Sequence, residues 1–142
     1  MEAPYQGVIL GISFNHTIVF AKDRQESAWF FTTYFGLPDP VQAGPFLAVQ
    51  LEHGATLDFA QLDGEVFPQH YAFLVSEVDF DAIYGRIVAA GLEHWPDPHS
   101  GRSGTINHND GGRGVYFNDP SGHRLEIITV PYGGWPQDRS VH

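Results

Sequence analysis

Two histidines and two carboxylates recur at related places along the chain. His16 lies in a strand-like run, and His70 follows it by 54 residues, again beside a strand-like run. Each half also ends in a strand-like segment where a carboxylate stands between two large apolar residues, Asp58 in the first half and Glu126 in the second. Imidazole nitrogens and carboxylate oxygens are ligands of divalent metal ions. A repeat that brings them to related positions therefore indicates a metal site built by duplication.

The segments between these residues repeat as well. Helix-like runs extend from Asp23 to Phe35 and from Asp79 to Ala90, with their first residues 56 positions apart. An aspartate is a suitable N-cap for each helix, and Glu26 completes an approximate capping box in the first. Gly36 and Gly91 follow the two helices, where a left-handed residue commonly ends a helix. The two halves therefore predict the same order of elements.

The fold class expected from this order is α+β. We predict two βαβββ modules that form a cupped mixed sheet with the helices on its convex face. The chain is expected to be one domain over residues 1–142, with module 1 at about 10–62, module 2 at about 66–131 and a peripheral tail at 132–142. The expected strands are 12–20, 46–51, 55–60, 71–75, 114–118 and 123–130, with a short strand beginning at Trp95. Residues 97–112, with four glycines, read as a long loop of the kind that often binds ligands or covers a site.

Strand alternation predicts which side chains share a face. His70 and Glu126 are expected on the concave face, and Tyr116 with them, where its phenol either orients a substrate as a weak acid or simply packs. His16 shares its face with apolar residues, which suits a mostly apolar ligand pocket with a few polar groups. Asp58 is either a fourth metal ligand or a spectator.

Other chemistry-bearing residues have structural interpretations. Trp29, Phe30 and Phe35 occur at helical spacing and are expected in the core. Arg102 and Arg113 are the plausible anion-binding groups, but a solvated surface role is favoured for both. The remaining histidines are expected in loops, turns or the tail, without a ligand role: His53, His94, His99, His108, His123 and His142.

Composition excludes several classes of function. The formal net charge of −10 disfavours binding to nucleic acids or anionic membranes. The sequence contains no cysteine, which excludes disulfides, thiolate metal sites and a thiol nucleophile. Residues 1–11 lack the basic and apolar regions of a signal peptide, and a cytoplasmic location is expected.

The chain resembles the vicinal oxygen chelate superfamily of glyoxalases, bleomycin-resistance proteins and extradiol dioxygenases. The matching segments are residues 15–37, residues 70–73 and residues 114–126, the last with an aromatic pair, an Asp-Pro-x-Gly turn and a Leu-Glu pair. The resemblance implies paired βαβββ modules and a divalent metal held by His16, His70 and Glu126. It also implies a homodimer, because in many one-domain relatives the cup forms between subunits.

Departures from these relatives separate the possible functions. Glyoxalase I enzymes normally carry a glutamate where Asp58 stands, and fosfomycin-resistance enzymes use several basic residues to hold a phosphonate, whereas this chain has one lysine. Bleomycin-binding members lack metal ligands. Extradiol enzymes are about twice as long but share the two-histidine, one-carboxylate set, which leaves open positions suited to non-haem Fe(II).

The sequence therefore predicts a metal-dependent enzyme acting on a small oxygenated, aromatic substrate, with dioxygenase chemistry favoured slightly. Fe(II) is the favoured ion, with Mn, Ni and Zn as alternatives. A glyoxalase I-like lyase or isomerase, or a thiol transferase, is the second possibility. A non-catalytic protein that sequesters an antibiotic or other small molecule is the third.

Overall fold

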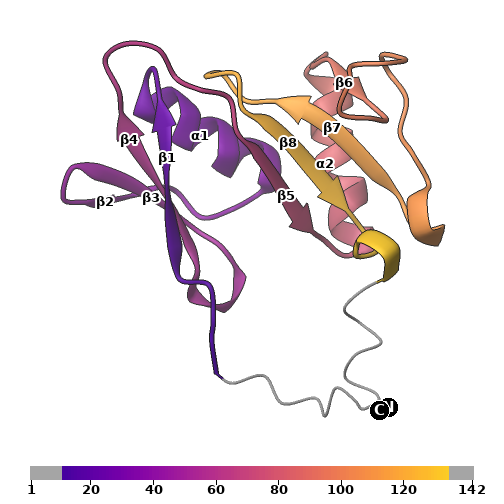
Figure 1. Ribbon diagram of the computed structural model, residues 1–142, viewed down its shortest axis with the longest axis horizontal. Helices are drawn as coiled ribbons and strands as arrows, with labels where there is room; N and C mark the ends of the chain where they lie inside the picture. The colour runs from indigo at the N-terminus through magenta and orange to yellow at the C-terminus, as the bar shows by residue number, and fades with distance from the viewer. Residues whose placement is uncertain (1–10, 135–142) are drawn as a thin grey trace.

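The computed structural model describes residues 11–134, which form two modules of the same architecture (Figure 1). Module 1 consists of β1 (His16–Ala21), α1 (Arg24–Phe35), β2 (Val41–Ala43), β3 (Phe46–Gln50) and β4 (Thr56–Gln61). Module 2 consists of β5 (His70–Leu74), α2 (Glu77–Ala89), β6 (His94–Trp95), β7 (Gly114–Asn118) and β8 (Arg124–Ile128). Short 3-10 turns occur at Glu52–Gly54, Asn109–Gly111 and Tyr132–Gly134. The predicted α+β class and the paired βαβββ modules are confirmed.

Each module forms its own four-stranded mixed sheet. The strand orders are β1-β4-β3-β2 and β5-β8-β7-β6, so equivalent strands occupy equivalent places. In each sheet the first and last strands of the module pair in parallel, and the other pairs are antiparallel. The register is also repeated, because Ile18 lies opposite Asp58 and Ala72 lies opposite Glu126. In both modules the carboxylate therefore pairs with the residue two places after the histidine.

Capping residues define where the two helices begin and end. Asp23 accepts hydrogen bonds from the backbone N–H groups of Gln25 and Glu26, as expected for an N-cap. The predicted cap of α2 was wrong, because Ser76 rather than Asp79 precedes the helix and accepts a hydrogen bond from the Asp79 backbone N–H. The Ser-x-x-Asp spacing places Asp79 in the first turn, where its charge favours the helix dipole. Neither helix, nor any other within residues 11–134, has the length and apolarity to cross a bilayer.

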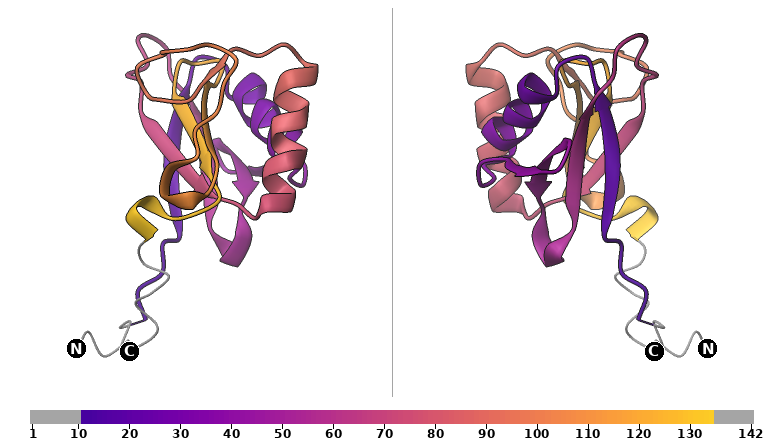
Figure 2. Two further views of the ribbon diagram at one scale, coloured as in Figure 1. Left: turned by 90° about the vertical axis from the view of Figure 1, so that its right-hand side faces the viewer. Right: turned by 90° about the vertical axis from the view of Figure 1, so that its left-hand side faces the viewer.

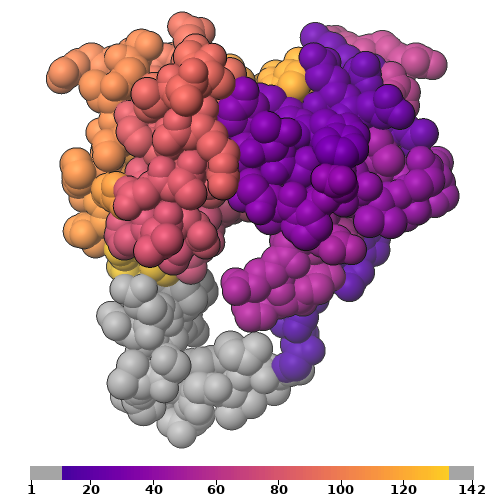
Figure 3. Space-filling view, turned by 180° about the vertical axis from the view of Figure 1, so that it is seen from behind, coloured from indigo at the N-terminus to yellow at the C-terminus, as the bar shows by residue number. Residues whose placement is uncertain are grey.

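Both helices lie side by side on one face of the molecule, and the sheets form the opposite face (Figures 2 and 3). The core between these layers is continuous across both modules. Phe31 of α1 is fully buried and packs its ring against Phe59 of module 1 and Phe73 of module 2. Phe35 stacks on Phe31 and contacts the rings of Phe73 and Phe117. One aromatic cluster therefore holds the two modules together.

Two details of the sequence-based expectation were wrong. Trp29 is 46% exposed and does not belong to the core. Phe30 and Phe35 do pack against the core, as expected. The helix turns about 100° per residue, and it is Phe31 that faces the sheets while Trp29 faces outward. The first strand begins at His16, and Ile12 lies in exposed irregular chain before it.

A buried turn joins the modules on the sheet side. His123 is 1% exposed, and its Nδ1 accepts a hydrogen bond from the Gln69 backbone N–H at 2.9 Å. The proton must then be on Nε2, which donates to the Phe20 carbonyl at 2.7 Å. The hydroxyl of Ser121 accepts a hydrogen bond from the Lys22 backbone N–H at 3.0 Å. The turn between β7 and β8 therefore fastens module 2 to the end of β1.

Replacing Phe31 with alanine should lower the free energy of unfolding by about 3–5 kcal/mol, because a fully buried ring is lost from the shared cluster. Trp29→Ala, in the same helix, is the matched control and should cost much less because its side chain is half exposed. Urea unfolding followed by circular dichroism measures both. Equal losses for the two variants would contradict the packing described for α1.

Candidate functional site

The parallel pair β5–β8 brings His70 and Glu126 together. His70 begins β5, and Glu126 lies at the centre of β8 with its apolar neighbours Leu125 and Ile127 fully buried on the opposite face. The imidazole Nε2 lies 2.9 Å from Glu126 Oε1, so the ring donates to the carboxylate. The His70 side chain is 49% exposed and that of Glu126 is 13% exposed. Two side chains of the kinds that coordinate divalent metal ions therefore meet at an accessible point.

Tyr116 is the third member of this group. It pairs with Glu126 across the antiparallel β7–β8 ladder, and its ring centroid lies 5.8 Å from that of His70. Burial raises the pKa of the Tyr116 phenol well above its ordinary range, and the neighbouring Glu126 carboxylate raises it further. The phenol therefore stays protonated at neutral pH and can donate a hydrogen bond.

A cavity of about 270 Å³ opens over these side chains. Its wall combines the concave face of module 2 with the end of the loop 97–112, which contributes Asn107, Asn109 and Asp110. The Asp110 carboxylate accepts a hydrogen bond from the Gly133 backbone N–H at 2.9 Å, which fixes the loop to the 3-10 turn Tyr132–Gly134. The long loop predicted from the sequence thus lines the candidate site.

His16 lies in the other sheet, on the exposed face of β1. Its Nδ1 is 2.7 Å from the side-chain oxygen of its neighbour Asn15. Within residues 11–134 of one chain, no three histidine or acidic side chains come together in an arrangement that could hold a metal ion. The structure therefore brings together His70 and Glu126, and it does not bring His16 to them within one chain.

Asp58 occupies the position equivalent to Glu126 but has different contacts. Its carboxylate accepts a hydrogen bond from the Thr56 hydroxyl at 2.8 Å, within the same strand. The side chain is one methylene shorter than that of Glu126, and no hydrogen bond joins it to His16 in the described chain. The two modules thus share a backbone register but differ in how the histidine and carboxylate meet.

Large apolar side chains surround His16 on the same exposed face. Ile18 is 42% exposed and Phe20 is 47% exposed, while Val19 and Ala21, which alternate with them, are buried in the core. Phe67 lines a hollow together with Ile18 and Phe20, and Ile12 and Phe14, in the chain just before β1, are exposed as well. Contiguous exposed apolar residues of this kind mark an interaction surface.

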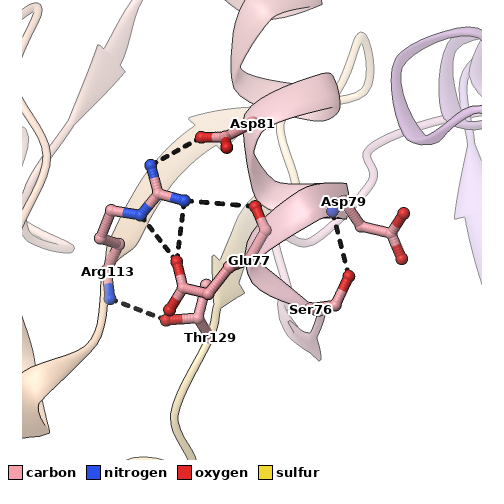
Figure 4. A network of polar contacts seen from close by, with 6 residues as sticks. All are labelled: Ser76, Glu77, Asp79, Asp81, Arg113 and Thr129. Atoms are coloured by element: carbon pink, nitrogen blue, oxygen red, sulfur yellow. Dashed lines mark hydrogen bonds and ion pairs between the residues drawn. The ribbon is translucent and has the colours of Figure 1, made fainter.

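Arg113, one of the two cations considered for anion binding, is held by α2 (Figure 4). Its guanidinium forms ion pairs of 2.8 Å with both Glu77 and Asp81 and lies 4.4 Å from the centroid of the Phe80 ring. Hydrogen bonds from Thr129 and Arg113 lower the pKa of Glu77, which keeps this partner ionised. The side chain lines the cavity edge but is already matched in charge.

Two of the histidines given no ligand role are buried rather than in solvated loops. His94 is 7% exposed in β6; its Nδ1 donates to the Leu92 carbonyl, so its Nε2 accepts from the Tyr84 hydroxyl. His123 joins the modules as described above. Neither lines the cavity. The short strand expected to begin at Trp95, directly after His94, was the signal in the sequence that could have indicated this burial.

The protonated state of Tyr116 has a consequence at alkaline pH. The folded chain keeps this proton above the pH at which the unfolded chain loses it. The resulting stabilisation is therefore full below about pH 10 and declines as the pH rises through the higher folded-state pKa. For chelator-treated protein, urea unfolding across this range should show a steeper loss of stability than in Tyr116→Phe. Tyr132→Phe is the control, because this side chain is 87% exposed and raises the Tyr116 pKa less than burial and Glu126 do, so its slope should stay close to that of the parent. If stability fell equally steeply with pH in the parent and in Tyr116→Phe, the raised pKa of Tyr116 would be contradicted.

Known proteins share both this fold and this sequence pattern. Oxidase ChaP-H1 is 55% identical in sequence, with a TM-score of 0.85 over 87% of this chain and 100% of its own. Oxidase ChaP-H2 has the same identity and TM-score over 88% of this chain and 99% of its own. Glutathione transferase FosA of Serratia marcescens is 30% identical over 81% of this chain and 79% of its own length.

The family model that matches the chain covers residues 13–127, which include every element from β1 to β8 apart from the last residue of β8. Together with the repeated βαβββ modules, this match shows that the chain belongs to the Glyoxalase/Bleomycin resistance protein/Dioxygenase superfamily.

Proposed function

We propose that the chain is a divalent-metal-dependent enzyme that oxidises a small oxygenated aromatic molecule. His70 and Glu126 of one subunit would hold the metal together with His16 of a second copy, and Tyr116 would contact the substrate. The observation that carries this proposal is the approach of His70 Nε2 to Glu126 Oε1 beneath a cavity.

The donor set fits a divalent ion. His70 Nε2 and Glu126 Oε1 already lie side by side. A second histidine would complete a three-ligand set, which leaves open coordination positions for substrate oxygens. A divalent ion held there supplies Lewis acidity and a template for two adjacent oxygens of the substrate. Fe(II) suits this set and oxygen-dependent chemistry, while Mn, Ni and Zn accept the same ligand types.

The surface around His16 supports its use by a second copy. Ile18 and Phe20 present apolar area beside it that a single chain leaves in water. A two-fold dimer would bury this face on both copies and form two equivalent sites. The concave face of module 2 is open at His70, which gives the partner strand access.

The residues of this chain have separate tasks in such a site. Tyr116 keeps its proton and can donate a hydrogen bond to a substrate oxygen as negative charge develops there. Glu126 orients the His70 ring through the hydrogen bond to Nε2 in the absence of the ion. The loop 97–112 closes one side of the cavity, which reduces the access of water.

Oxidation is favoured over other reactions of the superfamily because the two oxidases share 55% identity with this chain, whereas the transferase shares 30%. Thiol transfer is the second candidate, supported by the same transferase and by Metallothiol transferase FosB of Lysinibacillus sphaericus, which is 27% identical over 89% of this chain and 86% of its own length. The cavity contains no cation that is free of carboxylate partners among the described residues, which disfavours a phosphonate substrate.

Removing His70 or Glu126 should abolish stoichiometric metal binding. We expect about one divalent ion per purified chain, and a loss of at least about tenfold in metal affinity for His70→Ala or Glu126→Ala. His53→Asn is the control, because His53 is exposed in a turn with positive φ that asparagine also tolerates. Elemental analysis and competition with a chelator measure the loss. Unchanged metal content in His70→Ala would refute the site.

Mixed dimers test whether the site is shared. His16→Ala and Glu126→Ala should each be inactive alone, because each lacks one ligand at every site. When the two variants are co-refolded, mixed dimers should contain one intact site, and about a quarter of the parental metal content should return. No recovery, with dimers present by light scattering, would exclude a site built from two copies.

Oxygen uptake separates the two reactions. The Fe(II)-loaded protein should consume dioxygen in the presence of aromatic diols, without a requirement for added thiol. A rate that depends instead on a thiol, with Mn or Zn and no uptake of oxygen, would favour the transferase.

A further inference from the structure

The charges around the cavity are unbalanced. Two carboxylates line it, Glu126 at the base and Asp110 at the rim, and Arg113 is the one cation among the described lining residues. Two further carboxylates, Glu77 and Asp81, stand beside Arg113 on α2. A bound metal would offset the charge at Glu126 only, at the base. The part of a ligand that points away from His70 therefore meets an acidic rim.

Arg113 does not compensate for this rim. Its Nη1 and Nη2 are each 2.8 Å from a different carboxylate, and its Nη2 also donates to the Glu77 backbone carbonyl at 3.2 Å. Figure 4 shows the ion pairs that hold the guanidinium against α2, and its Cζ also lies 4.4 Å from the centroid of the Phe80 ring. A ligand anion could bind this guanidinium only by displacing two ion pairs.

In our proposed dimer, the described cations that follow β1 of the second copy would lie away from this place. The module 1 cations near β1 are Lys22 and Arg24, which follow the end of the strand that His16 begins. Lys22 lies six positions beyond His16 along extended chain, about 20 Å away. When His16 approaches the metal ligands, these cations lie far from the cavity.

Asp110 is positioned as part of the rim by its backbone. It has a φ of 56°, a left-handed conformation that aspartate and asparagine tolerate better than most residues. Its hydrogen bond from the Gly133 N–H holds the carboxylate between the loop and the turn Tyr132–Gly134. The loop 97–112 therefore places a negative charge on the wall of the cavity that His70 and Tyr116 also line.

We propose that this site selects neutral or cationic aromatic diols over anionic ones, and that Asp110 is a specificity-determining residue for this preference. The inference rests on the proposed function, because it assumes that a diol binds at the metal. It goes further in assigning the charge of the distal substituent, and it separates this chain from relatives that act on anions.

Three catechols with the same chelating head test the preference. They are dopamine, which is cationic at neutral pH, 4-methylcatechol, which is neutral, and 3,4-dihydroxyphenylacetate, which is anionic. Their dissociation constants for the Fe(II)-loaded protein are measured anaerobically by calorimetry at low ionic strength. We expect the anion to bind about fivefold more weakly than the cation, the combined effect of Asp110 and of the partly screened carboxylates beside Arg113. Raising the salt concentration should reduce the difference.

Asp110→Asn should bring the anionic and cationic ligands about twofold to threefold closer in affinity. The asparagine keeps an oxygen for the Gly133 N–H and tolerates the positive φ, so the loop should remain in place. Asp39→Asn is the matched control, because it removes one exposed charge outside the cavity and should leave the ratio unchanged.

The possible outcomes separate the charge preference from the chelating site on which it depends. Binding of all three catechols with equal affinity, or tightest binding of the anion, would overturn the charge preference and leave the chelating site intact. A preference unchanged in Asp110→Asn would overturn the role of Asp110. Failure of every catechol to bind the metal-loaded protein would overturn the proposed function and the inference with it.

Discussion

The parallel pairing of the first and last strands in each module is the constraint on which the site depends. Parallel strands in register place residues of two distant segments side by side, and here Ala72 lies opposite Glu126. His70, two residues before Ala72, can then reach the carboxylate with its side chain on the same face. Helices on the other face bury Leu125 and Ile127, which fixes the direction in which Glu126 points. The His70–Glu126 contact is thus a result of sheet register and one-sided burial.

Much of this arrangement could be predicted because the sequence repeats. The alternation of apolar residues around Glu126 indicated its face, and the glycine after each helix indicated where the helix ends, since Gly36 has a φ of 67° and Gly91 a φ of 70°. The family match confirms the resemblance inferred from residues 15–37 and 114–126. Local sequence patterns were sufficient for these features, because strand alternation and helix termination depend on neighbouring residues in the chain.

The parts that sequence patterns missed depend on tertiary contacts. Whether Trp29 or Phe31 faces the core depends on how α1 lies across both sheets, which helical periodicity alone does not specify. The burial of His123 depends on Phe20 and Gln69, which lie 103 and 54 residues away in the chain. The commitment of Arg113 to Glu77 and Asp81 depends on the packing of α2 beside β7. In each case a polar or aromatic side chain gained partners that no local pattern contains.

Duplication has left the two modules with equivalent hairpins that now differ in their surroundings. The turn between β7 and β8 is buried and holds the end of β1 through Ser121 and His123. The corresponding turn between β3 and β4, Glu52–Gly54, is exposed, and His53 and Glu52 there are each 88% exposed. Exposed loop tips of this kind accept extra residues without loss of packing. A fluorescent reporter or affinity tag inserted at this hairpin would therefore leave the folded protein intact, whereas the same insertion at the other hairpin would separate the modules.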